Sequence, residues 1–478
     1  MSGNDFFALL PLLVLAGSSV LIMLLIAIRL SHRIIQRSSS FLFLIAFLSI
    51  FYIQKVFPYS LEPLLIVDGF SAFIMGLIIF SSIVVNILSY IYFEEKEESP
   101  KEYYVLLFLC TLGACVMAVS KHFVSLFLGL EILTVGLYAL MAYLRGRNKS
   151  IEAGIKYLVL AAFSSAFLLF GMALIYLETG SMEFTQIAKN LDTIQIPSTL
   201  FITGLGMMLV GVGFKLAVVP FHMWAADVYQ GAPVPITAFI ATASKAGVFA
   251  VLLRFFNEID AFRYNQVLWT VTFITIATLI VGNLLALQQK NVKRILAYSS
   301  IAHLGYLLVA FIPGNTLSLY AVSFYLLAYF ICTLTAFGVI TLLSNKVGDA
   351  EDIDTYKALF WQNPLLAFIF SVSLISLAGI PLTAGFIGKF YILLAALQSG
   401  FWLIALILVI TSVFGLYFYL RIITVMFSGN KIKVAKDVNP NPIFYATSLI
   451  TLFILTLLTI GIGVFPAGIM RLIEHLIR

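Results

Sequence analysis

The stretch GVGFKLAVVPFHMWAADVYQGAPVPITAFIATASKAG, residues 211–247, decides how the rest of the chain is understood. It is apolar enough to lie in a lipid bilayer, yet it carries Lys215 and Lys245. An ammonium group at mid-bilayer costs roughly 2.5 to 3.5 kcal/mol on insertion scales, so each lysine needs a reason to be there. Pro220 follows Lys215 by five residues and cannot continue the hydrogen-bond ladder of a helix. Because freed carbonyls are tolerated in a membrane only beside protein or water, this stretch predicts a broken helix that lines a wet cavity.

The composition is that of a polytopic membrane protein. Hydrophobic residues make up 62% of the 478 positions and charged residues 10%, and the mean hydropathy is +1.07. Soluble domains carry about 25% charged residues. With about 20 apolar residues to a crossing, we predict one all-α membrane domain of fourteen helices, over 6–28, 39–57, 69–92, 103–120, 122–143, 151–177, 199–225, 234–256, 266–288, 293–312, 316–344, 364–398, 401–426 and 442–466.

The basic residues predict the orientation of these helices. Fourteen crossings divide the loops into two sets, and one set holds seventeen of the 28 Lys and Arg residues: Arg29, Arg33, Arg37, Lys96, Lys101, Arg145, Arg147, Lys149, Lys290, Lys293, Arg294, Lys346, Lys357, Arg421, Lys431, Lys433 and Lys436. The other set holds seven: Lys55, Lys121, Lys189, Arg254, Arg263, Arg471 and Arg478. The positive-inside rule therefore places the loops at 29–38, 94–102, 145–150 and 427–440 in the cytoplasm and both termini outside. Since the +6 net charge is spread over short loops, it does not indicate nucleic-acid binding.

Four lysines remain, and they lie inside predicted helices: Lys156, Lys215, Lys245 and Lys389. The helix over 122–143 carries one carboxylate, Glu131, with Thr134 and Tyr138 on the same face. One carboxylate cannot neutralise four lysines, so desolvation must keep some of them neutral for part of the time. A lysine that alternates between the two forms is a proton carrier. The alternative is that Glu131 is a structural carboxylate satisfied by one lysine.

Polar stripes on two later helices are further candidates for proton transfer. The helix over 293–312 places Ser299, Ser300, His303 and Tyr306 on one face, and the helix over 316–344 carries a weaker stripe of Tyr325, Tyr329 and Cys332 or Thr333. A satisfied core histidine and ordinary helix packing are the alternatives. For Lys156, about five residues into its helix, the alternative is a side chain that reaches back to the membrane surface.

A second break is predicted in the over-long helix 364–398. Gly379 and Pro381 interrupt it, and Lys389 follows them. Breaks near Pro220 and Pro381 fall in the two halves of the chain, which is typical of internal repeats with sites at the membrane midplane. We take Pro220, Gly379 and Pro381 as candidate hinges.

No motif indicates a cofactor or metal in this chain. Cys110, Cys115 and Cys332 fall in apolar runs without metal-ligand spacing and are expected to be small core residues. The chain has no glycine-rich phosphate loop after a strand and no histidine pair for haem. The energy for ion movement is therefore expected to come from other proteins.

These residues resemble a known family, the antiporter-like membrane subunits of respiratory complex I and of multisubunit cation/proton antiporters. KRILAYSSIAHLGY at 293–306 and the two broken helices resemble the family as a whole. PFHMW at 220–224, DVYQGAP at 227–233 and TAFIATASKAG at 237–247 are similar to subunit N of NADH:quinone oxidoreductase. The resemblance spans nearly the whole chain.

The resemblance implies a fold, site roles and partners. The fold is two inverted five-helix repeats, the fourth to eighth and ninth to thirteenth helices, which divides the chain into 1–100, 101–260, 261–430 and 431–478. Glu131 and Lys215 become a pair, Lys245 the central relay and Lys389 the terminal lysine towards the outside, with His222 as a weaker candidate beside the tyrosines. The partners are sister antiporter-like subunits and other subunits that hold FMN, iron-sulfur clusters, NADH and quinone, in a bacterial inner membrane.

Three functions follow from the sequence. The first is a proton-translocating subunit driven by NADH oxidation in other subunits. The second is a subunit of a cation/proton antiporter, and the third is a structural membrane subunit that pumps nothing. Co-purification with flavin and iron-sulfur subunits distinguishes the first from the second. Lysine replacements that reduce proton pumping but leave assembly intact exclude the third.

Overall fold

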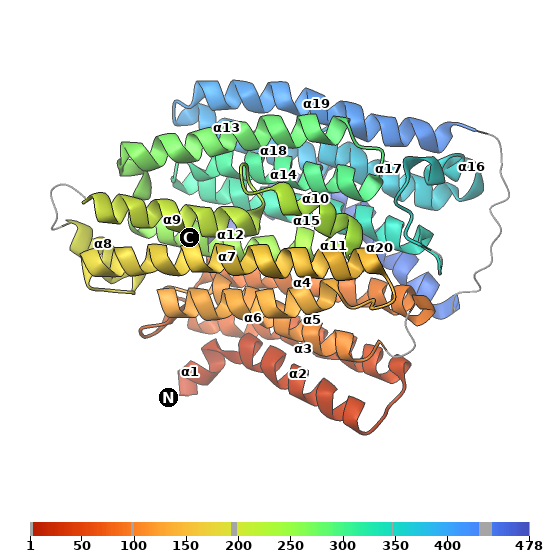
Figure 1. Ribbon diagram of the computed structural model, residues 1–478, viewed down its shortest axis with the longest axis horizontal. Coiled ribbons are helices and arrows are strands. Elements are labelled where there is room, and N and C mark those ends of the chain that lie inside the picture. Colours follow the sequence, from red (N-terminus) through yellow and green to blue (C-terminus); the bar gives the residue numbers. More distant parts are fainter. Residues whose placement is uncertain (1–2, 97–99, 193–197, 347, 430–441, 478) are drawn as a thin grey trace.

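The computed structural model describes residues 3–96, 100–192, 198–346, 348–429 and 442–477, and these form a bundle of roughly parallel and antiparallel helices (Figure 1). The elements in chain order are α1 (Gly3–Ala8), α2 (Leu10–Ala27), α3 (His32–Ile53), η1 (Gln54–Val56), β1 (Tyr59–Leu61), β2 (Leu65–Val67), α4 (Gly69–Lys96), α5 (Glu102–Ala118), α6 (Phe123–Met141), α7 (Asn148–Thr179), α8 (Phe184–Asp192), α9 (Thr199–Leu216), α10 (Met223–Gly231), α11 (Val234–Ala241), α12 (Ala243–Glu258), η2 (Ala261–Arg263), α13 (Asn265–Leu287), α14 (Val292–Phe311), α15 (Thr316–Leu343), η3 (Ile353–Tyr356), α16 (Leu359–Gln362), α17 (Pro364–Ala378), α18 (Ala384–Gln398), α19 (Trp402–Phe427), α20 (Pro442–Val464) and α21 (Pro466–Ile477). The all-α membrane fold expected from hydropathy is confirmed.

The predicted crossings correspond to helices in the structure. Within the described ranges, twelve helical segments are long and apolar enough to span a bilayer. The two remaining predicted crossings are α5, with 17 residues, and the pair α17 and α18, with 15 residues each. Long apolar helices are the stable choice in lipid because they satisfy every backbone group internally. Polar residues open several of them; for example, Ser198 and Asn291 accept hydrogen bonds from backbone N–H groups at the starts of α9 and α14.

Both predicted breaks are present. Helix α9 ends at Leu216, Ala217 adopts a left-handed conformation (φ 58°), and the chain becomes helical again at Met223, with Pro220 in the gap. Helix α17 ends at Ala378, and Gly379 follows in a left-handed conformation (φ 85°) that suits glycine. A third break was not predicted: Thr242, with φ −118° and ψ −88°, separates α11 from α12. Nothing in the local sequence resembles a helix stop there.

Several short elements were also not predicted. A hairpin of β1 and β2 pairs Tyr59 with Val67 between α3 and α4, and α21 follows α20 at the end of the chain. A further short helix, α8, lies between α7 and α9. The three cysteines are free and buried, as expected for core residues.

The loops gather at two ends of the bundle in the two sets that the basic residues defined. One end is joined by the ion pairs Lys96–Asp349, Arg147–Asp349 and Lys149–Glu351, and the other by Lys121–Glu62, Arg254–Asp68 and Arg263–Asp192. The N and C labels both lie towards the end of the bundle at which α8 is found (Figure 1). Lys431, Lys433, Lys436 and Arg478, and most of the predicted loop 427–440, lie outside the described residues. The grouping supports the predicted topology without identifying the cytoplasmic end.

The two halves use similar packing. Helix α7 packs against both parts of the first broken helix, α9 and α10, and α15 packs against both parts of the second, α17 and α18. The pairs α5 with α6 and α13 with α14 open the two halves in the same way. This correspondence supports the proposed repeats over 101–260 and 261–430, with 1–100 and 431–478 added at the ends.

Candidate functional site

Three lysines are buried in the middle of the bundle. Lys215, Lys245 and Lys389 are 6%, 2% and 8% exposed. None of them forms an ion pair with a carboxylate in the described part of the chain; each donates a hydrogen bond to an oxygen without formal charge. Burying an unpaired ammonium is costly, whereas a neutral amine in the same place is tolerated. The three positions can therefore change protonation state without breaking an ion pair.

The first lysine lies at the break after α9. Lys215 is the next-to-last residue of α9, and its Nζ donates to Oγ1 of Thr134 on α6 at 2.7 Å. The ring of Tyr157 lies 5.2 Å from the same Nζ. Glu131, one turn before Thr134, accepts a 2.6 Å hydrogen bond from Ser165 on α7. Glu131 and Thr134, the hydrogen-bond partner of Lys215, therefore lie on the same face of α6. Glu131 and Lys215 themselves make no direct ion pair in the described residues.

The second lysine joins the two predicted stripes. Lys245 Nζ on α12 donates to Ser300 Oγ on α14 at 2.7 Å, and that hydroxyl lies 2.6 Å from Tyr329 Oη on α15. Tyr229 Oη approaches Ser300 at 3.4 Å. Lys245 follows the Thr242 break by three residues. Lys245, like Lys215, therefore lies beside an interruption of a helix, and the same holds for Lys389, described below.

The stripe continues along α14 through His303. Its Nδ1 lies 2.5 Å from Tyr325 Oη and its Nε2 lies 3.1 Å from Tyr419 Oη, so both ring nitrogens have partners. Tyr419 Oη also hydrogen-bonds Ser299. Tyr419, on α19, was missed because a tyrosine in an apolar helix gives no signal until the helix packing is known.

The third lysine reaches back to the second break. Lys389 is on α18, yet its Nζ donates to the carbonyl oxygen of Ala378, the last residue of α17, at 2.9 Å. The charge therefore lies at the level of the break and not beyond it, because helical side chains point towards the N-terminus. A Cβ on Gly379 would lie 2.8 Å from Lys389 Cδ, so the lysine also needs glycine there. The ammonium lies 4.7 Å from the ring of Tyr306, which ends the α14 stripe.

Lys156 lies apart from these groups. Its side chain is 41% exposed and pairs with Glu152 at 2.6 Å and Asp227 at 2.9 Å. Asp227 also pairs with Arg294 at 2.7 Å. Lys156, Glu152 and Asp227 border a surface cavity of about 140 Å³ at the end of the bundle that holds the basic loops. Unlike the three buried lysines, Lys156 is partly exposed and ion-paired, which favours the alternative of a side chain that reaches the membrane surface.

His222 is also apart from the lysine sites. It precedes α10 and is buried, and its Nδ1 has no hydrogen-bond partner among the described residues. Pro220 lies in the same irregular segment, while Pro381 lies with Gly379 in the second one. The two segments interrupt helices, between α9 and α10 and between α17 and α18, as predicted. That they act as hinges is a proposal.

The structure contains a buried charge cluster that was not predicted. Asp349, in the loop after α15, accepts hydrogen bonds from Lys96 at 2.7 Å, Lys293 at 3.0 Å and Arg147 at 3.2 Å, and from Tyr92 at 2.8 Å. Burial alone raises the pKa of the Asp349 carboxyl, but the three cations outweigh burial and hold that pKa well below its ordinary value. The cluster ties α4 to loops of both halves of the chain.

The described residues contain no group of three or more His, Cys, Asp or Glu side chains arranged to hold a metal ion.

The chain is similar to a family of membrane proteins and to several solved structures. The profile of a family described as NADH:quinone oxidoreductase/Mrp antiporter, transmembrane, matches residues 120–415, a range that includes every lysine site above. A chain of respiratory complex I from Thermus thermophilus with bound aureothin is 31% identical, with a TM-score of 0.82 over 96% of this chain and 98% of that one. A chain of the archaeal membrane-bound sulfane sulfur reductase is 27% identical, with a TM-score of 0.84 over 98% and 96%. A chain of the Mrp complex from Dietzia sp. DQ12-45-1b has the same fold at 21% identity, with a TM-score of 0.85 over 100% and 98%.

Proposed function

Since the chain belongs to the NADH:quinone oxidoreductase/Mrp antiporter family of membrane proteins, we propose that it is a proton-translocating subunit of an NADH:quinone oxidoreductase, and specifically subunit N. The subunit-specific part rests on the motifs at 220–224, 227–233 and 237–247. The proton-translocating part rests on the three buried lysines.

The observation that carries the proposal is the set of lysine partners. A structural ammonium in a bilayer is expected to pair with a carboxylate. Among the described residues, Lys215, Lys245 and Lys389 instead donate hydrogen bonds to a threonine hydroxyl, a serine hydroxyl and a backbone carbonyl. A hydroxyl accepts from an ammonium and can reverse to donate to a neutral amine. The hydroxyls at Lys215 and Lys245 can therefore pair with either protonation state, and the carbonyl at Lys389 accepts a hydrogen bond from the ammonium or from the neutral amine. A carrier needs partners for both states, and a structural anchor does not.

The α14 stripe supplies a route between two of the lysines. Ser300 contacts Lys245, His303 lies one turn further on, and Tyr306 lies one turn beyond that, beside Lys389. Tyrosine and histidine can both accept and donate protons. We propose that protons pass from Lys245 to Lys389 along this stripe and leave from Lys389 on the outer side.

The first half supplies the input to this route. Glu131 lies within one helical turn of the Thr134 hydroxyl that holds Lys215, so its charge favours the protonated lysine. No side-chain hydrogen bond joins Lys215 or Thr134 to Lys245 or Ser300 within the described residues, so transfer between them requires water or a change of rotamer. Lys156 we assign as an interfacial anchor, held by Glu152 and Asp227.

The rest of the proposal concerns the assembly. The redox groups, FMN and iron-sulfur clusters, and the sites for NADH and quinone belong to partner subunits, and sister antiporter-like subunits flank this chain in a bacterial inner membrane. The alternative is a subunit of a cation/proton antiporter, which the family profile also covers. Affinity purification of the chain from its native membrane tests the choice: flavin and iron-sulfur subunits in the purified complex support the oxidoreductase, and antiporter subunits without redox groups overturn it.

A further inference from the structure

Another buried lysine differs from the three lysine sites in its partners. Lys293 is the second residue of α14, and its side chain is fully buried. Its Nζ donates to the backbone carbonyl oxygens of Gln230 at 2.8 Å and Ala232 at 2.7 Å, and to the Asp349 carboxylate at 3.0 Å. An ammonium has three donors, and all three are used here. Because one acceptor is a carboxylate, the charged form is favoured and the lysine is suited to a fixed contact.

The two carbonyls belong to the junction of α10 and α11, residues 230–233. The last carbonyls of a helix have no partner within that helix. Lys293 holds the carbonyls at 230 and 232, and Ser150 on α7 donates to the carbonyl between them, that of Gly231, at 2.9 Å. Three consecutive carbonyls are therefore held from two neighbouring helices.

The junction lies next to a residue of the second lysine site. Tyr229 Oη lies 3.4 Å from Ser300 Oγ, and the Tyr229 ring lies 5.8 Å from Lys245 Nζ. Thr237 Oγ1 on α11 donates to the Tyr229 carbonyl at 3.2 Å, which ties the start of α11 to the end of α10. The place of the junction therefore sets where Tyr229 meets Ser300.

Helix α14 contacts this segment at two points on one face. Lys293 and Ser300 are seven residues apart, which is about two turns and about 10 Å along the helix axis. Lys293 holds the junction, and Ser300 accepts the hydrogen bond from Lys245. Because both contacts are on one helix, a shift of the junction along α14 changes the contact at Ser300.

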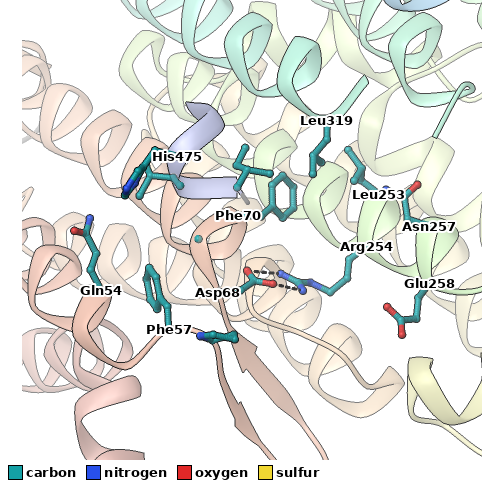
Figure 2. Close-up of a pocket in the computed structure, with 14 residues that line it drawn as sticks. Gln54, Phe57, Asp68, Phe70, Leu253, Arg254, Asn257, Glu258, Leu319 and His475 are labelled. Carbon is teal, nitrogen blue, oxygen red and sulfur yellow. Dashed lines mark hydrogen bonds and ion pairs between the residues drawn. The ribbon is translucent and has the colours of Figure 1, made fainter. Parts of the chain in front are cut away.

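The far end of the segment is anchored by a different ion pair. Arg254 lies one turn before the end of α12, and its Nη1 and Nη2 donate to the Asp68 carboxylate at 2.7 and 3.0 Å. Figure 2 shows this pair in the wall of a pocket, away from α14. The segment from α10 to α12 is therefore held at both ends, with the Thr242 break between them. Loss of the Lys293 contacts should loosen only the end at the junction.

We propose that Lys293 is a positioning residue: it fixes the junction of α10 and α11, and thereby the contact of Lys245 with Ser300. This inference rests on the proposed proton translocation, in which Lys245 carries protons. It assigns a role to the lysine that opens the motif at 293–306.

Hydrogen exchange of the purified complex, measured by mass spectrometry, reports on the junction directly. In Lys293→Met, amide exchange over 223–241 should be about tenfold faster, the effect of losing one hydrogen bond to a charged group. Exchange at the end of α12, over 250–258, should not change. Asp349 keeps Lys96 and Arg147 as partners in this variant, so we expect the complex to assemble.

Proton pumping in proteoliposomes separates positioning from proton carriage. Lys293→Met should lower the number of protons pumped per NADH by about tenfold. Lys293→Arg should pump within about twofold of the wild type, because arginine keeps the charge and several donors but cannot release its proton. Lys290→Met, at an exposed lysine just before α14, is the matched control and should match the wild type in both measurements.

Wild-type exchange over 223–241 in Lys293→Met, or faster exchange with wild-type pumping, would each overturn the proposal. Poor pumping by Lys293→Arg with wild-type exchange would also overturn it, because Lys293 would then act as a carrier. Poor pumping together with faster exchange in Lys293→Arg would support the link between the junction and pumping. The exchange measurement does not depend on pumping, so a failure here is distinct from a failure of the proposed function, which Lys389→Arg tests.

Discussion

Lys245 on α12 and Tyr329 on α15 share one hydroxyl: Ser300 Oγ lies 2.7 Å from Lys245 Nζ and 2.6 Å from Tyr329 Oη. The serine is thus the only side chain in the described residues that hydrogen-bonds to both. Its removal leaves a buried ammonium without its partner, at a cost of about 1 to 3 kcal/mol.

We therefore expect Ser300→Ala to slow proton pumping by about tenfold, which corresponds to about 1.4 kcal/mol in the barrier, without loss of assembly. Fluorescence quenching in proteoliposomes during NADH oxidation measures the pumping. Ser323→Ala is the control, because the Ser323 hydroxyl donates back to Leu319 of its own helix. Wild-type pumping by the Ser300 variant would remove this serine from the route.

Glu131→Gln tests the first half of the route. The amide keeps the shape and can still accept from Ser165, but it removes the negative charge that favours protonated Lys215. A change of about tenfold in the protonation equilibrium of Lys215 is expected, about 1.4 kcal/mol, and pumping should fall with assembly intact. If the reconstituted variant pumps at the wild-type rate, the carboxylate has only a structural role.

The topology is tested by labelling two introduced cysteines with an impermeant maleimide. Arg145 is exposed at the end with the basic loops, whereas Arg147 is held by Asp349, so Arg145→Cys is the better choice. Gln266→Cys marks the opposite end. In intact spheroplasts we expect labelling at position 266 only, and at both positions after lysis; labelling at 145 in intact cells would reverse the orientation.

Asp349→Asn tests the buried cluster. The change leaves Lys96, Lys293 and Arg147 without their shared carboxylate, and breaking a buried ion pair costs about 3 to 5 kcal/mol. Thermal unfolding of the purified protein in detergent should shift to lower temperature. Asp354→Asn, which removes an exposed pair with Lys357, should change it little.

The pH dependence of this effect follows from the lowered pKa of Asp349. A carboxyl whose pKa is lower in the folded protein stabilises it fully above the unfolded value, near 3.8, and loses this effect as the pH falls towards the folded value. The difference between wild type and Asp349→Asn should therefore be constant between about pH 6 and 8. A difference that shrinks as the pH rises through this range would contradict the assignment.

Local sequence signals predicted most of the fold. Apolar runs located the spans, and Pro220, Gly379 and Pro381 located two breaks, because proline and glycine have backbone requirements that do not depend on the rest of the fold. The stripe on α14 was visible from helical periodicity. Its hydrogen bonds to Tyr325 and Tyr329 agree with the stripe predicted on α15.

The features that were missed depend on long-range packing. Asp349 is brought to Lys96 across 253 positions and Tyr419 to His303 across 116. Thr242 breaks its helix without proline or glycine, so local propensity gave no sign of it. The ion pair of Lys156 with Asp227 joins residues 71 positions apart, so hydropathy could not predict it.

Arginine in place of lysine tests the central claim, that the buried lysines change protonation state, most directly. Arginine keeps the charge, but its pKa stays above about 12, so it cannot release the proton. We expect assembled complexes with Lys389→Arg to oxidise NADH but to pump few protons per NADH, while Lys156→Arg, at its half-exposed ion pairs, pumps as the wild type does. A wild-type number of protons pumped per NADH by the Lys389→Arg complex would contradict the claim and leave Lys389 as a packing residue.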